Sequence, residues 1–477
     1  MSSEAIKELA RERLAAAELA CTLGVPVSNV EEPPEQPRRA RWLVAATLLL
    51  GLGVAGGAAW MRSGEEGDDT EAQQRGPNDV VDPWWHKDFS RFNNRLIVSD
   101  GAALANDVDA VEVRLPGKAQ SWLVGFLKKP QIRFLTLQWR SDSALTAADW
   151  RAIAAMPNLE CLFLAPGPEL RIEHLRELRH APKLESVWLE PVWGGAPASA
   201  YGKNVVAALA GLPRLRMVSF FGCKVTRDAL IALAGLQNLD ALMLDRVAVE
   251  SDLFYLLSGL TQLRSLSISS PTHGWDPLAD HLHEIKRIPR LTSLELAVAA
   301  LQDSDLRSLP EQLESLRIFD ASKLTAAGVS TLGQLPKLRS LAFRSSIPIA
   351  LHEAVASVIE TRELENFECL VQSPTPRIWQ ALQRSPRLAG LAIFTVPHQP
   401  EFAQQLIECS KLPHLRDLEL KLAIRPEPSD LSVLRKLKSL RVVRLTRFSI
   451  APGWPSAEER KALEACLGPD VHVIING

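Results

Sequence analysis

The chain of 477 residues is 46% apolar and 23% charged, with 26 glycines and 32 prolines. This composition excludes a disordered or collagen-like protein and indicates a folded protein with a substantial hydrophobic core. The 54 Lys and Arg residues nearly balance the 56 Asp and Glu residues, which gives a formal net charge of -2. Because no large positive field is available to attract phosphates, nucleic acid is not an expected partner.

Residues 1–41 are predicted to form a cytoplasmic tail. A short helix is expected from Ser3, which can cap its N-terminus, to Leu23, with Gly24 as the stop signal. The helix could dock on a partner or lie on lipid, or the whole segment could be a solvated tail. The EEPPEQP run at residues 31–37 then forms an extended, proline-rich linker.

Residues 42–61 contain no charged side chain and are predicted to form a single transmembrane helix. Twenty residues at 1.5 Å each give a helix of about 30 Å, with Trp42 and Trp60 at the two interfacial belts. Three arginines precede the span and five acidic residues follow it within ten positions. The positive-inside rule therefore predicts a cytoplasmic N-terminus and an extracytoplasmic remainder of the chain.

Two other interpretations of this span fit the sequence less well. Gly51, Gly53 and Gly56 match a dinucleotide-binding turn, but the polar segment that follows cannot complete a βαβ unit. A cleaved signal peptide fits poorly because forty-one residues precede the apolar run. An uncleaved signal anchor is favoured, followed by an acidic linker and N-terminal cap at residues 62–100. The composition and the lack of an N-x-S/T sequon favour a bacterial cell membrane.

From residue 101 onward one pattern recurs: an apolar residue, two variable residues, an apolar residue, one variable residue and one apolar residue. Leu159, Leu162 and Leu164 form one example. Fourteen copies occur at intervals of 22 to 31 residues, starting at Val108, Ile132, Leu159, Leu184, Leu215, Leu239, Leu263, Leu291, Leu313, Leu338, Leu364, Leu388, Leu415 and Leu440. The end of a further copy occurs at 471–474. Such regularity is typical of a solenoid built from repeats.

Helical periodicity fills the intervals between the predicted strands. The segments at 225–233 and 324–332 each open with a threonine, Thr226 and Thr325, that can cap a helix N-terminus. Many copies are preceded by a turn such as LPRL at 212–215, where proline ends the helix. Each unit is therefore predicted to consist of a strand, a turn and a helix.

This repeat resembles the leucine-rich repeat family over 101–477, and most closely its bacterial and ribonuclease-inhibitor-like forms, which carry a helix in each repeat. The Asn or Cys that this family places after the third apolar position is matched by Cys223 and is mostly absent elsewhere. The resemblance implies an α/β leucine-rich repeat solenoid, a horseshoe or arc with parallel strands inside and helices outside. It also implies a long concave surface for binding.

The middle residue of each strand should face the concavity. The N-terminal copies place apolar and aromatic side chains there or beside it, and these are the candidate partner-binding residues: Trp139, Phe163, Trp188, Phe221 and Met243. They form a binding patch if exposed, or ordinary core if a cap folds over them. The C-terminal copies place charges of alternating sign from Glu295 to Arg444, which are expected to form a solvated face.

No catalytic constellation is predicted. The six cysteines are widely separated, without the spacing of a zinc site or a disulfide scaffold. The loop from His273 to Glu284 contains metal-binding residue types, namely His273, Asp276, Asp280, His281, His283 and Glu284, but lacks a known ligand spacing. We expect no metal, no cofactor and no enzymatic activity, with a metal-dependent enzyme as the least favoured alternative.

The sequence therefore predicts a membrane-anchored protein that recognises a protein or envelope polymer without catalysis. The alternative from another class is a structural scaffold of the cell envelope, in which the repeats assemble into homo-oligomers.

Overall fold

The computed structural model describes residues 95–98, 110–115, 127, 129–139, 145–165, 172–190, 200–201, 203–247, 253–269, 279–298, 301–344, 347–369, 374–395, 400–422, 426–447 and 457–476. All of them belong to the compact unit Ala55–Gly477, and none to the unit Met1–Val54. The predictions of a tail at 1–41 and a membrane span at 42–61 lie outside these residues, as does the predicted linker and cap at 62–100 except for 95–98. Among the described residues, no helix has the length and apolar character needed to cross a bilayer.

One long sheet forms the framework of the unit. Its strands, all parallel to their neighbours, follow each other in chain order: β1 Arg95–Val98, β2 Ala110–Leu115, β3 Phe134–Trp139, β4 Cys161–Ala165, β5 Ser186–Leu189, β7 Met217–Phe221, β9 Ala241–Asp245, β10 Ser265–Ser269, β11 Ser293–Ala297, β12 Ser315–Ile318, β13 Ser340–Phe343, β14 Asn366–Cys369, β15 Gly390–Thr395, β16 Asp417–Leu422, β17 Val442–Arg447 and β18 His472–Asn476. The predicted α/β solenoid with a parallel sheet is confirmed.

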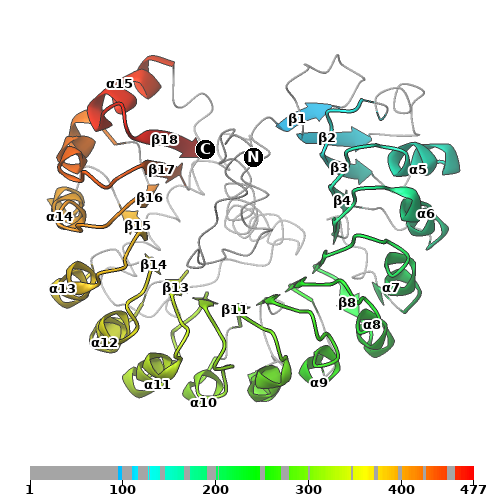
Figure 1. Ribbon diagram of the computed structural model, residues 1–477, viewed down its shortest axis with the longest axis horizontal. Helices are drawn as coiled ribbons and strands as arrows, with labels where there is room; N and C mark the ends of the chain where they lie inside the picture. Colours follow the sequence, from blue (N-terminus) through cyan, green and yellow to red (C-terminus); the bar gives the residue numbers. More distant parts are fainter. Residues whose placement is uncertain are drawn as a thin grey trace, which may run out of the picture. The chain divides into compact units, whose positions relative to one another are not determined.

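Helices connect successive strands and lie on the outer side of the sheet (Figure 1). The α-helices are α5 Ala147–Ala154, α6 Ile172–Glu177, α7 Lys203–Leu209, α8 Arg227–Leu233, α9 Leu253–Leu257, α10 Asp303–Leu306, α11 Ala326–Thr331, α12 His352–Arg362, α13 Pro376–Arg384, α14 Pro400–Cys409 and α15 Ala457–Leu467. The 3₁₀ helices are η3 Leu178–His180, η4 Ala279–Arg287, η5 Leu332–Gln334, η6 Ile349–Leu351 and η7 Pro428–Lys436. In the repeats of η4 and η7 a 3₁₀ helix takes the place of the expected α-helix.

The expected threonine caps are present. Thr226 precedes α8, and its side chain accepts a hydrogen bond from the backbone N–H of Ala229. Thr325 precedes α11 and accepts in the same way from Gly328. Each hydroxyl satisfies one of the backbone donors that a helix start leaves without a partner, so the helices begin where the sequence predicts.

Two features of the sheet were not expected. Strand β1 pairs in register with β2, so the sheet begins at Arg95, ahead of the boundary expected at residue 101. A separate two-stranded sheet pairs β6 (Ala200–Tyr201) with β8 (Lys224–Val225). Strand β2 belongs to the first copy of the repeat, and its Val111 and Val113 pair in register with Leu96 and Val98 of β1. The β6–β8 pair does not carry the repeat's apolar spacing.

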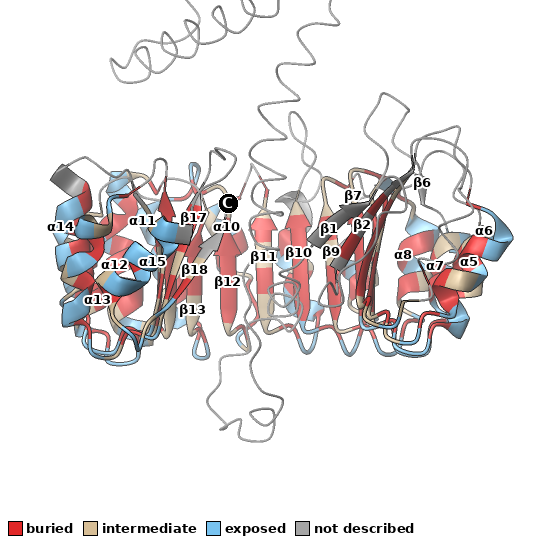
Figure 2. Cartoon of the chain, turned by 90° about the horizontal axis from the view of Figure 1, so that it is seen from above, coloured by how far each residue is buried: buried red, intermediate tan, exposed pale blue. Residues whose placement is uncertain are grey.

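The apolar positions of the repeat form one continuous core between the sheet and the helices. Leu159, Leu162 and Leu164 of one copy are completely buried, and the equivalent side chains of the neighbouring copies pack against them. Burial is concentrated in the strands and on the inward sides of the helices (Figure 2). Since full burial of one leucine stabilises a protein by about 1.5–3 kcal/mol, the stacked repeats share a large hydrophobic contribution.

Truncation of a core leucine should therefore be costly in the middle of the array. Leu316 of β12 is fully buried, and Leu316→Ala should lower the free energy of unfolding by about 3 kcal/mol because it leaves a cavity between neighbouring repeats. Urea titration followed by circular dichroism measures this change. The control Ile349→Ala removes a side chain that is 78% exposed and should shift the urea midpoint little. Equal shifts for the two variants would contradict the shared core.

Candidate functional site

The concave side of the sheet is formed by alternate residues of each strand. In-register pairing aligns the middle residues of successive strands into a row, so that Phe163 lies beside Trp188, Trp188 beside Ser219, and Ser219 beside Met243. Neighbouring strands in a sheet are about 4.8 Å apart. Side chains that are 24 to 31 residues apart in the sequence therefore become neighbours on this surface.

Three of the candidate binding residues meet on this face: Phe163 of β4, Trp188 of β5 and Met243 of β9, which we call the aromatic patch. The rings of Phe163 and Trp188 stack at a centroid distance of 6.2 Å and an interplanar angle of 26°. The indole Nε1 of Trp188 donates to the hydroxyl of Ser186 at 2.9 Å. All three side chains of the patch are half-buried.

A buried apolar layer supports the aromatic patch from one side. It consists of the first residues of the same strands and their neighbours: Phe134, Cys161, Met217 and Ala241. This contact holds the rings in place while leaving part of their surface accessible. The patch is thus intermediate between the two predicted states, an exposed binding surface and a covered core.

The other two candidates lie apart from the patch. Phe221 ends β7, and the guanidinium of Arg246 lies 5.2 Å from the centre of its ring, a cation–π contact. Arg246 has a positive φ of 52°, which is uncommon for a residue with a side chain. Trp139 is the last residue of β3 and pairs in register with Leu115 instead of lying in the middle row. The side chain of Trp139 is outside the described residues.

A half-buried carboxylate borders this region. Burial raises the pKa of Asp245, the last residue of β9, although a hydrogen bond with Ser269 and the positive charge of Arg246 act in the opposite direction. The negative charge of Glu295 adds to the upward shift. The end of the patch nearest to the charged arc therefore carries an acid whose neutral form is favoured by its surroundings.

The centre of the charged arc from Glu295 to Arg444 is buried at Arg317 and Glu368, instead of forming the solvated face that the sequence predicts, while Arg444 at its end is partly exposed. Glu368 of β14 is 9% exposed and lies at the centre of a buried network. Its carboxylate pairs with Arg344 at 3.1 Å and with Lys421 of β16. Arg317 pairs with Glu295 at 3.6 Å on the neighbouring strands.

Small side chains in the middle row explain why these charges become buried. Ala342 lies between Arg317 and Glu368 in the row, and Ala392 lies between Glu368 and Glu419. Two strand spacings amount to about 10 Å, which long Arg and Lys side chains can bridge when the intervening residue is small. An alternation of charges in the sequence would by itself indicate an exposed face. Here alanines separate the charged residues in the row, so that the charged groups can approach each other and become buried.

The three cations control the ionisation of Glu368. Burial alone would raise its pKa, but the charges of Arg344, Lys421 and Arg317 outweigh that effect and hold the pKa at about 2. Glu368 therefore remains ionised at neutral pH and holds the network together. Because its cations are already paired, the network favours a structural role over recruitment of an acidic ligand.

The described residues offer no activated nucleophile or metal centre. Burial raises the pKa of Cys223 to about 12 and also raises the pKa values of Cys409 and Cys466, so these thiols stay protonated. Cys161, Cys223, Cys369 and Cys409 are buried. Among the residues that the structure describes, no group of three His, Cys, Asp or Glu side chains could hold a metal ion.

The histidine-rich loop lies mostly beyond the described part of the chain. His273 and Asp276 are outside it, as are the side chains of Asp280 and His281. His283 and Glu284 are in η4, with 3.9 Å between Nε2 and Oε1. The prediction that this loop holds no metal therefore stays a prediction.

Comparison with known proteins concerns the fold. No protein-family model and no curated protein sequence matches the chain. The chain is similar to an internalin, InlF, from Listeria monocytogenes, with 15% sequence identity and a TM-score of 0.29 over 80% of this chain and 86% of that one. It is also similar to TLR13 in a complex with ssRNA13, with 16% identity and a TM-score of 0.39, covering 72% of this chain and 57% of TLR13.

The class of protein follows from the architecture of the chain itself. A long all-parallel sheet in chain order, outer helices and a recurring leucine pattern define an α/β solenoid of the leucine-rich repeat type.

The charge of Glu368 makes the stability of this solenoid dependent on pH. Its pKa is lower in the folded chain than in an unfolded chain, where it is about 4.3. Its contribution to stability is therefore complete above about pH 5 and is lost as the pH falls toward 2. Glu368→Gln should lower the free energy of unfolding by about 3 kcal/mol at pH 7, because it leaves three cations without their anion.

Urea titrations of both proteins at several pH values measure this effect. The difference between wild type and Glu368→Gln should shrink steadily below pH 5. Glu353→Gln, at an ion pair whose carboxylate side chain is 72% exposed, serves as the control and should have a much smaller effect. A difference for Glu368→Gln that does not change with pH would contradict the ionic role of this residue.

Proposed function

We propose that this chain is a non-catalytic recognition protein, anchored in a cell membrane by residues 42–61, which binds a protein or envelope polymer through the concave face of its repeats. The observation that carries the proposal is the aromatic patch, where Phe163, Trp188 and Met243 are held together on one face with part of their surface accessible. Aromatic side chains in a concavity contribute large contact areas and have few rotors to immobilise, so they serve as anchors in interfaces.

The charged arc supports this assignment indirectly. Arg317, Arg344, Glu368 and Lys421 are committed to each other, so a partner would gain little from displacing them. The principal binding energy is then expected at the aromatic patch, and the affinity should depend only weakly on salt.

Trp188 provides the direct test of the proposed function. Trp188→Ala should weaken partner binding by about 2 kcal/mol, or roughly thirty-fold, since it removes the central ring of the patch. The measurement is quantitative capture from native envelopes by the full chain, at 0.1 M and 0.5 M salt, followed by a dissociation constant for each captured component. Tyr255→Ala, on the outer helix α9 with the side chain 57% exposed, is the matched control.

Urea titration separates binding from folding in this test. If Trp188→Ala lowers the urea midpoint sharply while capture is unchanged, Trp188 belongs to the core and the concave proposal fails. If the chain captures only copies of itself and the change abolishes that contact, the patch serves self-assembly instead of recognition of another molecule.

The membrane topology is tested separately. Protease added to cells with a permeabilised outer envelope but an intact cytoplasmic membrane should degrade residues 101–477 and spare residues 1–41. This outcome is expected because the positive flank retains the N-terminus in the cytoplasm. Antibodies against tags at the two ends of the chain report which end survives. Survival of the repeats together with loss of the tail would reverse the proposed orientation.

A further inference from the structure

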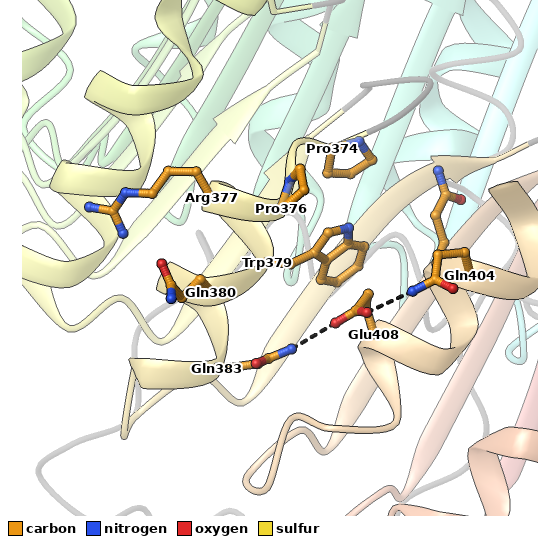
Figure 3. Close-up of a pocket in the computed structure, with 9 residues that line it drawn as sticks. Pro374, Pro376, Arg377, Trp379, Gln380, Gln383, Gln404 and Glu408 are labelled. Atoms are coloured by element: carbon orange, nitrogen blue, oxygen red, sulfur yellow. Dashed lines mark hydrogen bonds between the residues drawn. The ribbon is translucent and has the colours of Figure 1, made fainter.

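A hollow of about 500 Å³ lies between α13 and α14, in the outer helical layer. Its walls come from these two helices and the turn before α13, and the side chains face each other across the gap (Figure 3). The lining residues are Pro374, Pro376, Arg377, Trp379, Gln380, Gln383, Gln404, Gln405 and Glu408. None of them contributes to the concave row, so this hollow is distinct from the aromatic patch.

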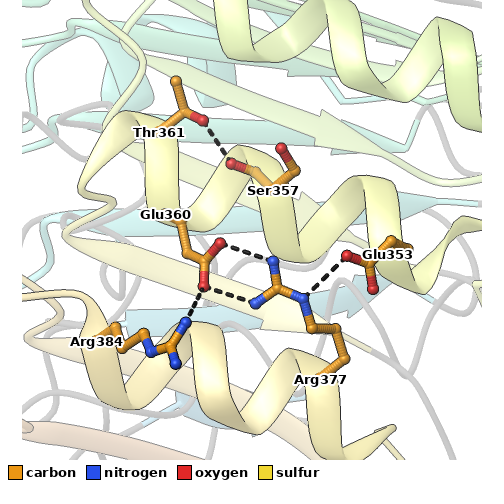
Figure 4. Close-up of polar contacts among 6 residues, drawn as sticks. All are labelled: Glu353, Ser357, Glu360, Thr361, Arg377 and Arg384. Atoms are coloured by element: carbon orange, nitrogen blue, oxygen red, sulfur yellow. Dashed lines mark hydrogen bonds and ion pairs between the residues drawn. The ribbon is translucent and has the colours of Figure 1, made fainter.

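The positive charge at the edge of the hollow is already neutralised. The guanidinium of Arg377 forms two hydrogen bonds with the carboxylate of Glu360, at 2.6 and 2.7 Å, and a third with Glu353 at 3.0 Å. Figure 4 shows these contacts between α12 and α13, with Arg384 on the same carboxylate of Glu360. Arg377 is thereby held toward α12, and an acidic ligand would have to compete with two carboxylates for it.

The negative charge in the hollow is satisfied as well. Glu408 accepts hydrogen bonds from the amide nitrogens of Gln383 and Gln404, both at 2.8 Å, and from the ammonium of Lys411 at 2.7 Å. Neither a cation nor an anion is therefore the expected occupant.

These same contacts orient the amides toward a ligand. An ionised carboxylate can only accept hydrogen bonds, so Gln383 and Gln404 must both turn their NH₂ groups to Glu408. Their carbonyl oxygens then remain as fixed acceptors, and within the described residues neither has a further partner. Gln380 and the indole N–H of Trp379 likewise make no hydrogen bond with the described part of the chain.

Apart from Gln405, the remaining surface of the hollow is apolar. Pro374 and Pro376 lie on the side of the α13 N-terminus, and Trp379, which is only 5% exposed, lies in the centre of the lining (Figure 3). Acceptors, donors and apolar rings are therefore grouped within one small volume. A pyranose ring presents the complementary set, with hydroxyl groups around its edge and C–H groups on its faces, and an acetamido group can both donate to and accept from a carboxamide.

We propose that the hollow between α13 and α14 binds a neutral glycan that contains N-acetylhexosamine. A peptide is disfavoured because extended peptides are recognised along a sheet edge, a helix groove or an aromatic-lined track, and this hollow is bounded by two short helices with its polar groups clustered. The volume of about 500 Å³ lies within the range of ordinary small-ligand sites.

Isothermal titration calorimetry of the full chain with N,N′-diacetylchitobiose tests the proposal. Saturable binding is expected for the wild type, and Gln404→Ala and Gln380→Ala should each weaken it at least five-fold. Glu408→Gln should weaken it similarly, because the two amides lose the carboxylate that orients them. Gln334→Ala, an exposed glutamine in η5, is the matched control and should bind like the wild type.

Two further probes define the ligand class. Cellobiose, which lacks the acetamido groups, should bind at least ten-fold more weakly, and N-acetyl-Ala-Ala-amide should not bind. Absence of saturable heat with chitobiose, equal binding by all variants, or tighter binding of the dipeptide would overturn the proposal. Trp188→Ala should leave the chitobiose affinity unchanged, so failure at the hollow and failure at the concave face are distinguishable.

Discussion

The structure depends on one constraint: no single repeat can bury its own leucines. Each copy offers three apolar side chains from its strand and a few from its helix, and these are buried only when the next copy stacks in register. In-register parallel pairing therefore runs through the whole sheet, from β1 to β18. A shift of one residue in any strand would move its leucines to the concave side and its polar residues into the core.

This register also determines the surface chemistry. Because the strands pair in register, their middle residues form one row across the sheet. Side chains of one chemical type on successive strands therefore become neighbours. Phe163, Trp188 and Met243 gather into one patch, although 80 residues separate the first from the last. The same register brings Arg317, Glu368 and Lys421 together over a hundred residues of sequence. A small change in sequence at one repeat can thus alter a site shared by several.

The features of the fold that recur in every repeat can be predicted from the sequence. Strand positions follow from the leucine spacing, and the starts of α8 and α11 follow from Thr226 and Thr325. Strand β1 was missed because the RLIV segment at 95–98 is short and carries only the last two apolar positions of the repeat, Leu96 and Val98, with Asn93 in place of the first. The burial of Glu368 was missed because the sequence shows only alternating charge, while burial depends on which side chains lie two strands away. The sequence feature that could have indicated this burial is the pair of small residues Ala342 and Ala392, which leave room for long side chains from two strands away.

The pocket between α13 and α14 was missed for a related reason. Its polar groups come from two adjacent repeats. In the sequence the glutamines look like ordinary exposed helix residues, and only the structure shows that Gln383 and Gln404 donate to Glu408. The pocket and the charged arc have one feature in common. In each, a carboxylate accepts hydrogen bonds or ion pairs from several side chains and thereby holds those side chains in one orientation. At Glu368 the donors are cations and the carboxylate is buried, so the contacts stabilise the solenoid and leave little for a ligand. At Glu408 two of the donors are amides, each with an unused acceptor, so the same arrangement produces a surface that can bind.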